Sequence, residues 1–210
     1  MVDYVRDHYG LAIRRACRLA QLHRSVFKYK SVLDPLLYFF AAQNDRVLRD
    51  VVVDLLYPRQ QAGFSDLPVE VVERQVREWV AEDKTTSRWG DATLVRVAQG
   101  VMATLRDFGV LQGKIHKRIT PMYLPAPAFA LIAHWLHQHE GSGDRTLHSE
   151  DWKLFFMPVA GVERLFIEAH QEHLVSYHAA GSVVRIDFPA TSLTEYAHVL
   201  LARTDQRPGG

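Results

Sequence analysis

Residues Arg88–Arg118 read RWGDATLVRVAQGVMATLRDFGVLQGKIHKR and contain the strongest structural signal in this chain. Apolar residues recur there at steps of three and four, which predicts a long amphipathic helix with one buried stripe. Gly109 follows the helix and can adopt the left-handed conformation that ends it. The stripe is expected to contain Leu94, Val97, Val101, Leu105 and Phe108.

The other side of this helix is polar, and Gly113–Ile119 after it reads as an exposed basic hairpin arm, or wing. A helix with a cationic face beside a cationic wing is typical of the winged helix-turn-helix on duplex DNA. We expect phosphate contacts from the cations and base-edge contacts from Thr93 and Gln99. The predicted DNA-binding residues of this unit are Arg88, Thr93, Arg96, Gln99, Arg106, Lys114, His116, Lys117 and Arg118.

The composition is that of an ordinary globular protein: 48% of the 210 residues are hydrophobic and 23% are charged. The net charge is only +1, so a nucleic-acid surface must come from local clustering of cations. Cys17 is the only cysteine, which excludes an internal disulfide and a multi-cysteine zinc site and fits the reducing cytoplasm. The longest apolar stretches fall short of the ~20 residues that span a bilayer, so no membrane segment is expected.

The N-terminal 31 residues predict a second basic motif. The spacing of Ala16, Leu22 and Val26 suits a helix-turn-helix, with cations on its outer side. For this motif, as for the Arg88–Arg118 unit, the alternative is that the charged face is simply solvated. If the motif binds DNA, the residues expected to do so are Arg14, Arg15, Arg18, Arg24 and Lys28.

The remaining pattern predicts a mainly α protein with small β-hairpin wings, in a tandem winged-helix-like arrangement. A proline-rich hinge at Pro121–Pro127 is followed by a helix over Ala128–His139 and a hairpin of Leu174–His178 with Val183–Phe188. The expected units are 1–31, 32–122 and 123–210. Loops are expected at Pro58–Pro68 and Gly141–Asp144, a closing helix at Leu193–Ala202, and a frayed tail at Thr204–Gly210.

No catalytic motif is recognisable in this sequence. Nucleophile elbows, phosphate-binding loops and dinucleotide-binding turns are not recognisable, so we expect neither an enzyme nor a cofactor. Five histidines have spacings that could pair imidazoles on a metal, but no cysteine or acidic pair completes a site. We therefore expect structural or surface roles for His134, His137, His139, His170 and His173.

The central region resembles the BrxA family of BREX phage-defence systems. The resemblance rests on Trp89 and Thr93, on the run Leu105–Leu111 (LRDFGVL), and on Lys117-Arg118-Ile119, and it is expected to extend from Leu33 to Leu201. It implies a cytoplasmic, non-enzymatic winged-helix protein that binds double-stranded DNA. It also implies partners within the defence system, namely a methyltransferase, an ATPase, a phosphatase-like protein and a protease.

The N-terminal segment is similar to the helix-turn-helix that opens IS3-type transposase subunits. The similar residues are Tyr9–Leu11, Arg14–Leu19, Arg24-Ser25 and Tyr29. The segment departs from that motif at Gln21 and His23, and no acidic catalytic domain follows it. Transposition is therefore not implied.

Two further hypotheses remain open at this point. One is a protein-interaction adaptor, which would use the acidic Asp66–Asp83 helix and the aromatic C-terminal half. The other is RNA binding by an antiterminator-like helical protein. Binding to duplex DNA, mainly through phosphates and with little sequence preference, is the leading prediction.

Overall fold

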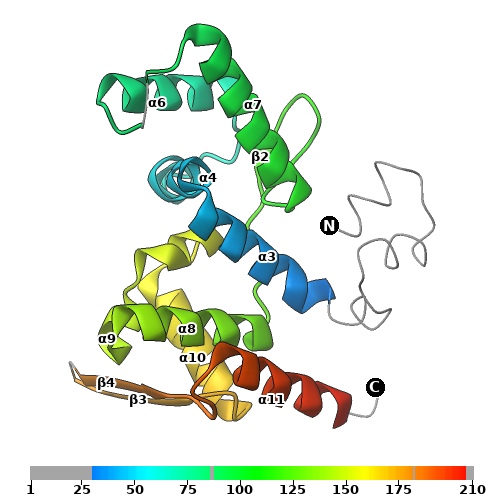
Figure 1. Cartoon of the computed structure of the whole chain (residues 1–210), viewed down its shortest axis with the longest axis vertical. Coiled ribbons are helices and arrows are strands. Elements are labelled where there is room, and N and C mark those ends of the chain that lie inside the picture. The colour runs from blue at the N-terminus through cyan, green and yellow to red at the C-terminus, as the bar shows by residue number, and fades with distance from the viewer. Residues whose placement is uncertain (1–29, 86–87, 182, 207–210) are drawn as a thin grey trace.

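The computed structural model describes residues 30–85, 88–181 and 183–206. The fold is mainly helical with two small antiparallel hairpins, which confirms the predicted class. Helix α3 (Lys30–Asn44) lies between two groups of elements, contacting α4 (Arg46–Asp50) and α8 (Ala126–Glu140) (Figure 1). The predicted N-terminal helix-turn-helix lies outside the described residues.

The first group, in the upper half of Figure 1, begins at α4 and ends in a hairpin. Asp45 caps α4, because its side chain accepts a hydrogen bond from the Leu48 amide at 3.1 Å. The elements that follow are the π-helical segment η2 (Val51–Leu56), α5 (Tyr57–Gln61), α6 (Val69–Ala81), α7 (Asp91–Asp107), β1 (Leu111–Gln112) and β2 (Arg118–Ile119).

The second group, in the lower half of Figure 1, begins at α8 and contains the second hairpin. Its two strands pair from Ser176↔Asp187 to Ala180↔Val183. After α8 come α9 (Gly143–Leu147), the 3-10 helix η3 (Glu150–Phe155), α10 (Val159–Gln171), β3 (Ser176–Ala180), β4 (Val183–Asp187) and α11 (Leu193–Gln206).

The buried residues form one cluster that passes through both groups. Tyr38 of α3 joins them: its ring centroid lies 5.5 Å from that of Phe108 and 5.7 Å from that of Phe155. Its hydroxyl donates a hydrogen bond to the Leu154 carbonyl at 3.1 Å, so this buried polar atom is satisfied. Trp152, Phe155 and Phe166, three aromatic residues of the C-terminal half, are buried in this cluster.

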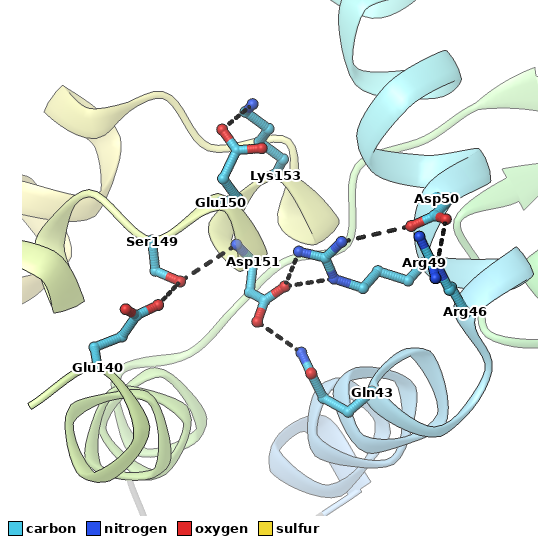
Figure 2. Close-up of polar contacts among 9 residues, drawn as sticks. All are labelled: Gln43, Arg46, Arg49, Asp50, Glu140, Ser149, Glu150, Asp151 and Lys153. Carbon is cyan, nitrogen blue, oxygen red and sulfur yellow. Dashed lines mark hydrogen bonds and ion pairs between the residues drawn. The ribbon is translucent and has the colours of Figure 1, made fainter. Parts of the chain in front are cut away.

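A polar contact also joins the two groups (Figure 2). Asp151 of η3 accepts hydrogen bonds from Arg49 of α4 at 2.8 Å and from Gln43 of α3 at 2.9 Å. Only 13% of the Asp151 side chain is exposed, so both of its oxygens use these donors in place of water.

Three sequence-based boundaries are wrong. Pro58 does not open a loop, because proline is tolerated in a first helical turn and α5 continues to Gln61. The predicted Gly141–Asp144 loop contains the start of α9, capped by Ser142. The predicted tail begins too early, because α11 continues to Gln206.

Gly143 has a structural role that loop composition did not reveal. A Cβ atom added there would lie 2.4 Å from the Val184 carbonyl oxygen, so the residue lets α9 approach β4 closely. The glycine is buried rather than flexible. Its position is decided by the second hairpin, which is distant in the chain.

Candidate nucleic-acid interface

Helix α7 presents a polar outer face opposite the core. Thr93, Arg96, Gln99 and Arg106 are all exposed, as their 3.6-residue spacing predicts. Gly100 lies on the same exposed side, and nothing lies within 4 Å of where its Cβ would be. The inner stripe is buried at Leu94, Ala98, Val101, Met102 and Leu105, whereas Val97 and Phe108 are only partly buried.

Arg88 does not belong to this face in the way that the sequence predicts. Helix α7 begins at Asp91, with Gly90 as its N-cap, because the Gly90 carbonyl accepts from the Thr93 and Leu94 amides. Arg88 therefore lies before the helix, and its Nε lies 3.6 Å from a carboxylate oxygen of Asp83.

The basic hairpin (Leu111–Ile119) follows α7 directly, and its first strand β1 contacts α7 (Figure 1). β1 and β2 pair as Leu111↔Ile119 and Gln112↔Arg118, so one pair is buried and the other is exposed. Gly113 has φ +103°, and a Cβ there would lie 2.1 Å from the His116 carbonyl oxygen. The loop therefore requires glycine at this position. Lys114, Ile115, His116 and Arg118 are exposed, and Lys117 is half-buried.

A third segment, Ser65–Leu67, pairs with the outer edge of β2. The Leu67 amide donates to the Lys117 carbonyl at 2.8 Å, and the Ile119 amide donates to the Ser65 carbonyl at 2.7 Å. These bonds cover the edge of β2 and hold the hairpin to the start of α6. The sequence did not indicate this segment, because it is too short for a period-two pattern.

Charge pairing divides the predicted cations into two sets. Arg88 pairs with Asp83, and Arg106 pairs with its neighbour Asp107 at 3.1 Å. Within the part of the chain that the structure describes, no carboxylate lies within 4 Å of the other set, which comprises Arg96, Lys114, Lys117 and Arg118. The sequence also has no acidic residue between Asp107 and Glu140.

Asp66 is the carboxylate that lies opposite Arg118 across the paired segments, and Arg59 holds it. Arg59 Nη2 lies 3.4 Å from Asp66 Oδ1, and Arg59 Nε donates to the Asp66 carbonyl at 2.8 Å. The Arg59 guanidinium also lies 5.1 Å from the Phe64 ring centroid. The Asp66 carboxylate therefore has Arg59 as its ion-pair partner, and no ion pair joins it to Arg118.

The first group (α4 to β2, residues 46–119) and the second group (α8 to α11, residues 126–206) are called the first and second units below. The second unit differs in charge, although it too has a helix before a hairpin. Helix α10 exposes Arg164, Ile167 and Glu168, so its outer face is mixed. On the second hairpin, Arg185 is neutralised by Asp187, whose Oδ2 lies 2.8 Å from Arg185 Nε. Among the described residues, the predicted cations that have no carboxylate partner therefore lie on α7 and the basic hairpin.

The histidines have partners of their own. His134 is buried, its Nε2 lies 3.1 Å from the Ala190 carbonyl oxygen, and burial lowers its pKa. His137 Nδ1 lies 3.0 Å from the Thr146 hydroxyl, and His170 Nδ1 accepts from the Tyr177 amide at 3.2 Å. Over residues 30–85, 88–181 and 183–206, no three His, Cys, Asp or Glu side chains gather as a metal site would require.

The five N-terminal cations predicted to bind DNA, namely Arg14, Arg15, Arg18, Arg24 and Lys28, lie outside the described residues. Among the helices that are described, none combines the length and apolar content that a membrane span requires.

Comparison with known protein families gives a match that covers most of the chain. The sequence matches the BrxA family over residues 4–135, which is more than half of the chain. The chain belongs to the BrxA family. Membership of the BrxA family indicates a component of a BREX phage-defence system. No curated protein and no solved structure matches the chain.

The BrxA match covers α3 to β2 and the first part of α8, and it includes every residue on which the resemblance rested. It begins at residue 4 instead of Leu33 and ends at residue 135 instead of Leu201. The N-terminal basic segment is therefore part of the matched region. The cationic face of α7 and the basic hairpin also lie within it.

Proposed function

We propose that this BrxA protein is a non-enzymatic, double-stranded-DNA-binding component of its defence system. The observation that carries the proposal is a set of cations that have no carboxylate partner among the described residues: Arg96 on the outer face of α7, and Lys114, Lys117 and Arg118 on the basic hairpin that follows it. Phosphate contacts of this kind supply affinity without base specificity. Thr93 and Gln99 lie on the same helix face and are available for base edges.

The order of elements supports a winged-helix interpretation of residues 46–119. A helix, a short paired segment, two helices and a two-stranded hairpin follow one another, with the segment at Ser65–Leu67 closing the sheet. In this arrangement α7 is the helix that would enter the major groove, and the basic hairpin would grip the backbone beside it. A protein near neutrality overall can bind in this way, because the charge is concentrated where contact is made.

The test is fluorescence anisotropy of a labelled duplex titrated with the full chain over a range of salt concentrations. We expect binding at low salt that weakens as salt rises, and strong loss in the K114E/K117E/R118E variant. The matched control is R145E/R164E/R185E, which reverses three exposed cations of the second unit and changes the net charge equally. Absence of binding by the wild type at low salt, or equal loss in both variants, would overturn the proposal.

A second candidate function, a protein-interaction adaptor within the defence system, is favoured by the second unit. Its exposed apolar residues are Val159 and Ile167 on α10 and Val183 on the second hairpin. Co-expression with the methyltransferase, the ATPase, the phosphatase-like protein and the protease of the same system tests this function. A nuclease-resistant complex formed by a chain without DNA affinity would favour the adaptor. Competition between duplex DNA and structured RNA separates both functions from RNA binding.

A further inference from the structure

Ile115 is the most solvent-exposed large hydrophobic residue among those described, with 87% of its surface accessible. It lies at the tip of the basic hairpin, with Lys114 before it and His116 and Lys117 after it. A side chain in this position contributes almost nothing to the stability of the fold, because it is not buried. We therefore expect Ile115 to contact another molecule.

The two arms of the hairpin below Ile115 lie close together. The two arms of the hairpin approach closely at Gly113, where a Cβ atom would overlap the His116 carbonyl oxygen. Below the tip, the Lys117 carbonyl accepts from the Leu67 amide, and the Thr120 amide donates to the Val110 carbonyl at 2.8 Å. The tip is thus a short loop whose two arms are both held by backbone hydrogen bonds.

The surroundings of Ile115 are cationic and apolar together. Lys114 and Lys117 flank it, and neither has a described carboxylate within 4 Å. The minor groove of DNA has the complementary character: two phosphate-bearing walls stand over a floor of sugars and base edges, about 6 Å apart. Proteins that enter this groove often place an isoleucine, leucine or phenylalanine against the base steps.

We infer that the tip of the basic hairpin enters the minor groove and that Ile115 contacts its floor, with Lys114 and Lys117 on the two phosphate walls. This inference rests on the proposed function and adds the groove, the contacting residue and a base preference. The amino group of guanine projects into the minor groove, whereas adenine–thymine pairs leave the floor open. An isoleucine offers that amino group no acceptor, so the tip should favour adenine–thymine and inosine–cytosine pairs over guanine–cytosine pairs.

The second hairpin supplies a matched control. Val183 is also apolar and 67% exposed, and it also lies beside a hairpin turn. Its nearest cation in the sequence, Arg185, is neutralised by Asp187. V183S therefore removes a similar exposed side chain from a tip without unpaired cations.

The experiment measures anisotropy of the full-length wild type, I115S and V183S on three duplexes of equal length, with adenine–thymine, inosine–cytosine and guanine–cytosine pairs. Inosine–cytosine keeps the major-groove pattern of guanine–cytosine and lacks only the minor-groove amino group. For the wild type we expect tighter binding to the first two duplexes. For I115S we expect about tenfold weaker binding to them and no preference left, whereas V183S should behave as the wild type.

Salt dependence separates this inference from the proposed function. I115S removes no phosphate contact, so the slope of log K against log salt should not change, whereas K114A should lower its magnitude by about 1. Three results would overturn the minor-groove inference and leave DNA binding intact. I115S could bind DNA as tightly as the wild type, V183S could lose as much affinity as I115S, or the wild type could bind the three duplexes equally well. Failure of the wild type to bind any duplex would overturn the proposed function itself. Loss of binding to anionic phosphatidylglycerol vesicles in I115S, with DNA affinity unchanged, would reassign the tip to membranes.

Discussion

Arg49 and Asp151 are 102 residues apart in the sequence, yet Nε and Nη2 of the arginine both lie 2.8 Å from Oδ1 of the aspartate (Figure 2). Gln43 donates to the other oxygen of the same carboxylate. The contact joins α4, which leads into the cationic unit, to η3 in the second group. It therefore contributes to how the two units are held relative to each other.

Removal of the Asp151 carboxylate should destabilise the protein. D151A leaves the partly buried Arg49 and Gln43 donors without their acceptor, and we expect the free energy of unfolding to fall by about 2 kcal/mol. R46M is the matched control, because Arg46 pairs with Asp50 at a site where 79% of its side chain is exposed. That change should cost no more than about 0.5 kcal/mol. Urea unfolding of both variants checks the prediction, and similar losses would contradict it.

Stability should depend on pH through His134. Burial lowers the pKa of this imidazole, and its Nδ1 has no hydrogen-bond partner among the described residues, so the folded state favours the neutral ring. The unfolded chain binds the proton more readily. The contribution of His134 is therefore complete above the ordinary histidine pKa of about 6.5 and is lost as the pH falls below it.

The measurement is the free energy of unfolding between pH 5 and 8 for the wild type, H134L and a control, H198L, at an exposed site on α11. The difference between wild type and H134L should shrink as the pH falls, by at most about 1.4 kcal/mol per pH unit. H198L controls for the replacement of a histidine by leucine at a site that is not buried. A constant difference for H134L would show that His134 does not titrate as its burial requires.

Gly100 should separate stability from binding. It lies inside α7 with open space around it, so G100A should stabilise the fold by about 0.5–1 kcal/mol through helix propensity. The same methyl group stands on the face proposed to lie in the major groove, and we expect DNA affinity to fall. Thermal melting and anisotropy of the one variant test both effects. A more stable G100A that binds as well as the wild type would exclude close approach of DNA at this point of the helix.

G143A tests the opposite case. A Cβ atom there would meet the Val184 backbone at 2.4 Å, and neither backbone can move without disturbing the contact of α9 with β4. We expect destabilisation by about 1–3 kcal/mol, the usual cost of overpacking. Urea unfolding of G143A beside G100A should give changes of opposite sign. Two stabilised variants would contradict the close approach.

Pairing with carboxylates should decide how much each cation contributes to DNA binding. With four available phosphate contacts, the slope of log K against log salt should be about −3.6. R96A should reduce its magnitude by about 1, whereas R88A and R106A should reduce it less, because Asp83 and Asp107 already neutralise these arginines. Equal effects of the three variants would show that the ion pairs open when DNA binds.

Much of the candidate interface is predictable from local sequence. The spacing from Leu94 to Leu105 places Thr93, Arg96, Gln99 and Arg106 on the outside, and Gly113 with its basic neighbours predicts a hairpin. Neither inference needs a residue more than a few positions away. Arg88 is the exception, because the helix starts at Asp91, after a glycine whose carbonyl begins the hydrogen-bond ladder.

Local sequence patterns are enough to predict the mainly helical class, the outward face of α7 and the basic hairpin, because helix periodicity and turn chemistry depend on near neighbours. Three contacts come from packing alone: residues 65–67 cover the edge of β2, Arg59 pairs with Asp66, and Asp151 accepts a hydrogen bond from Arg49. These contacts bring together residues that no local pattern connects. Which cations keep their charge available for a ligand therefore depends on the packing of distant segments.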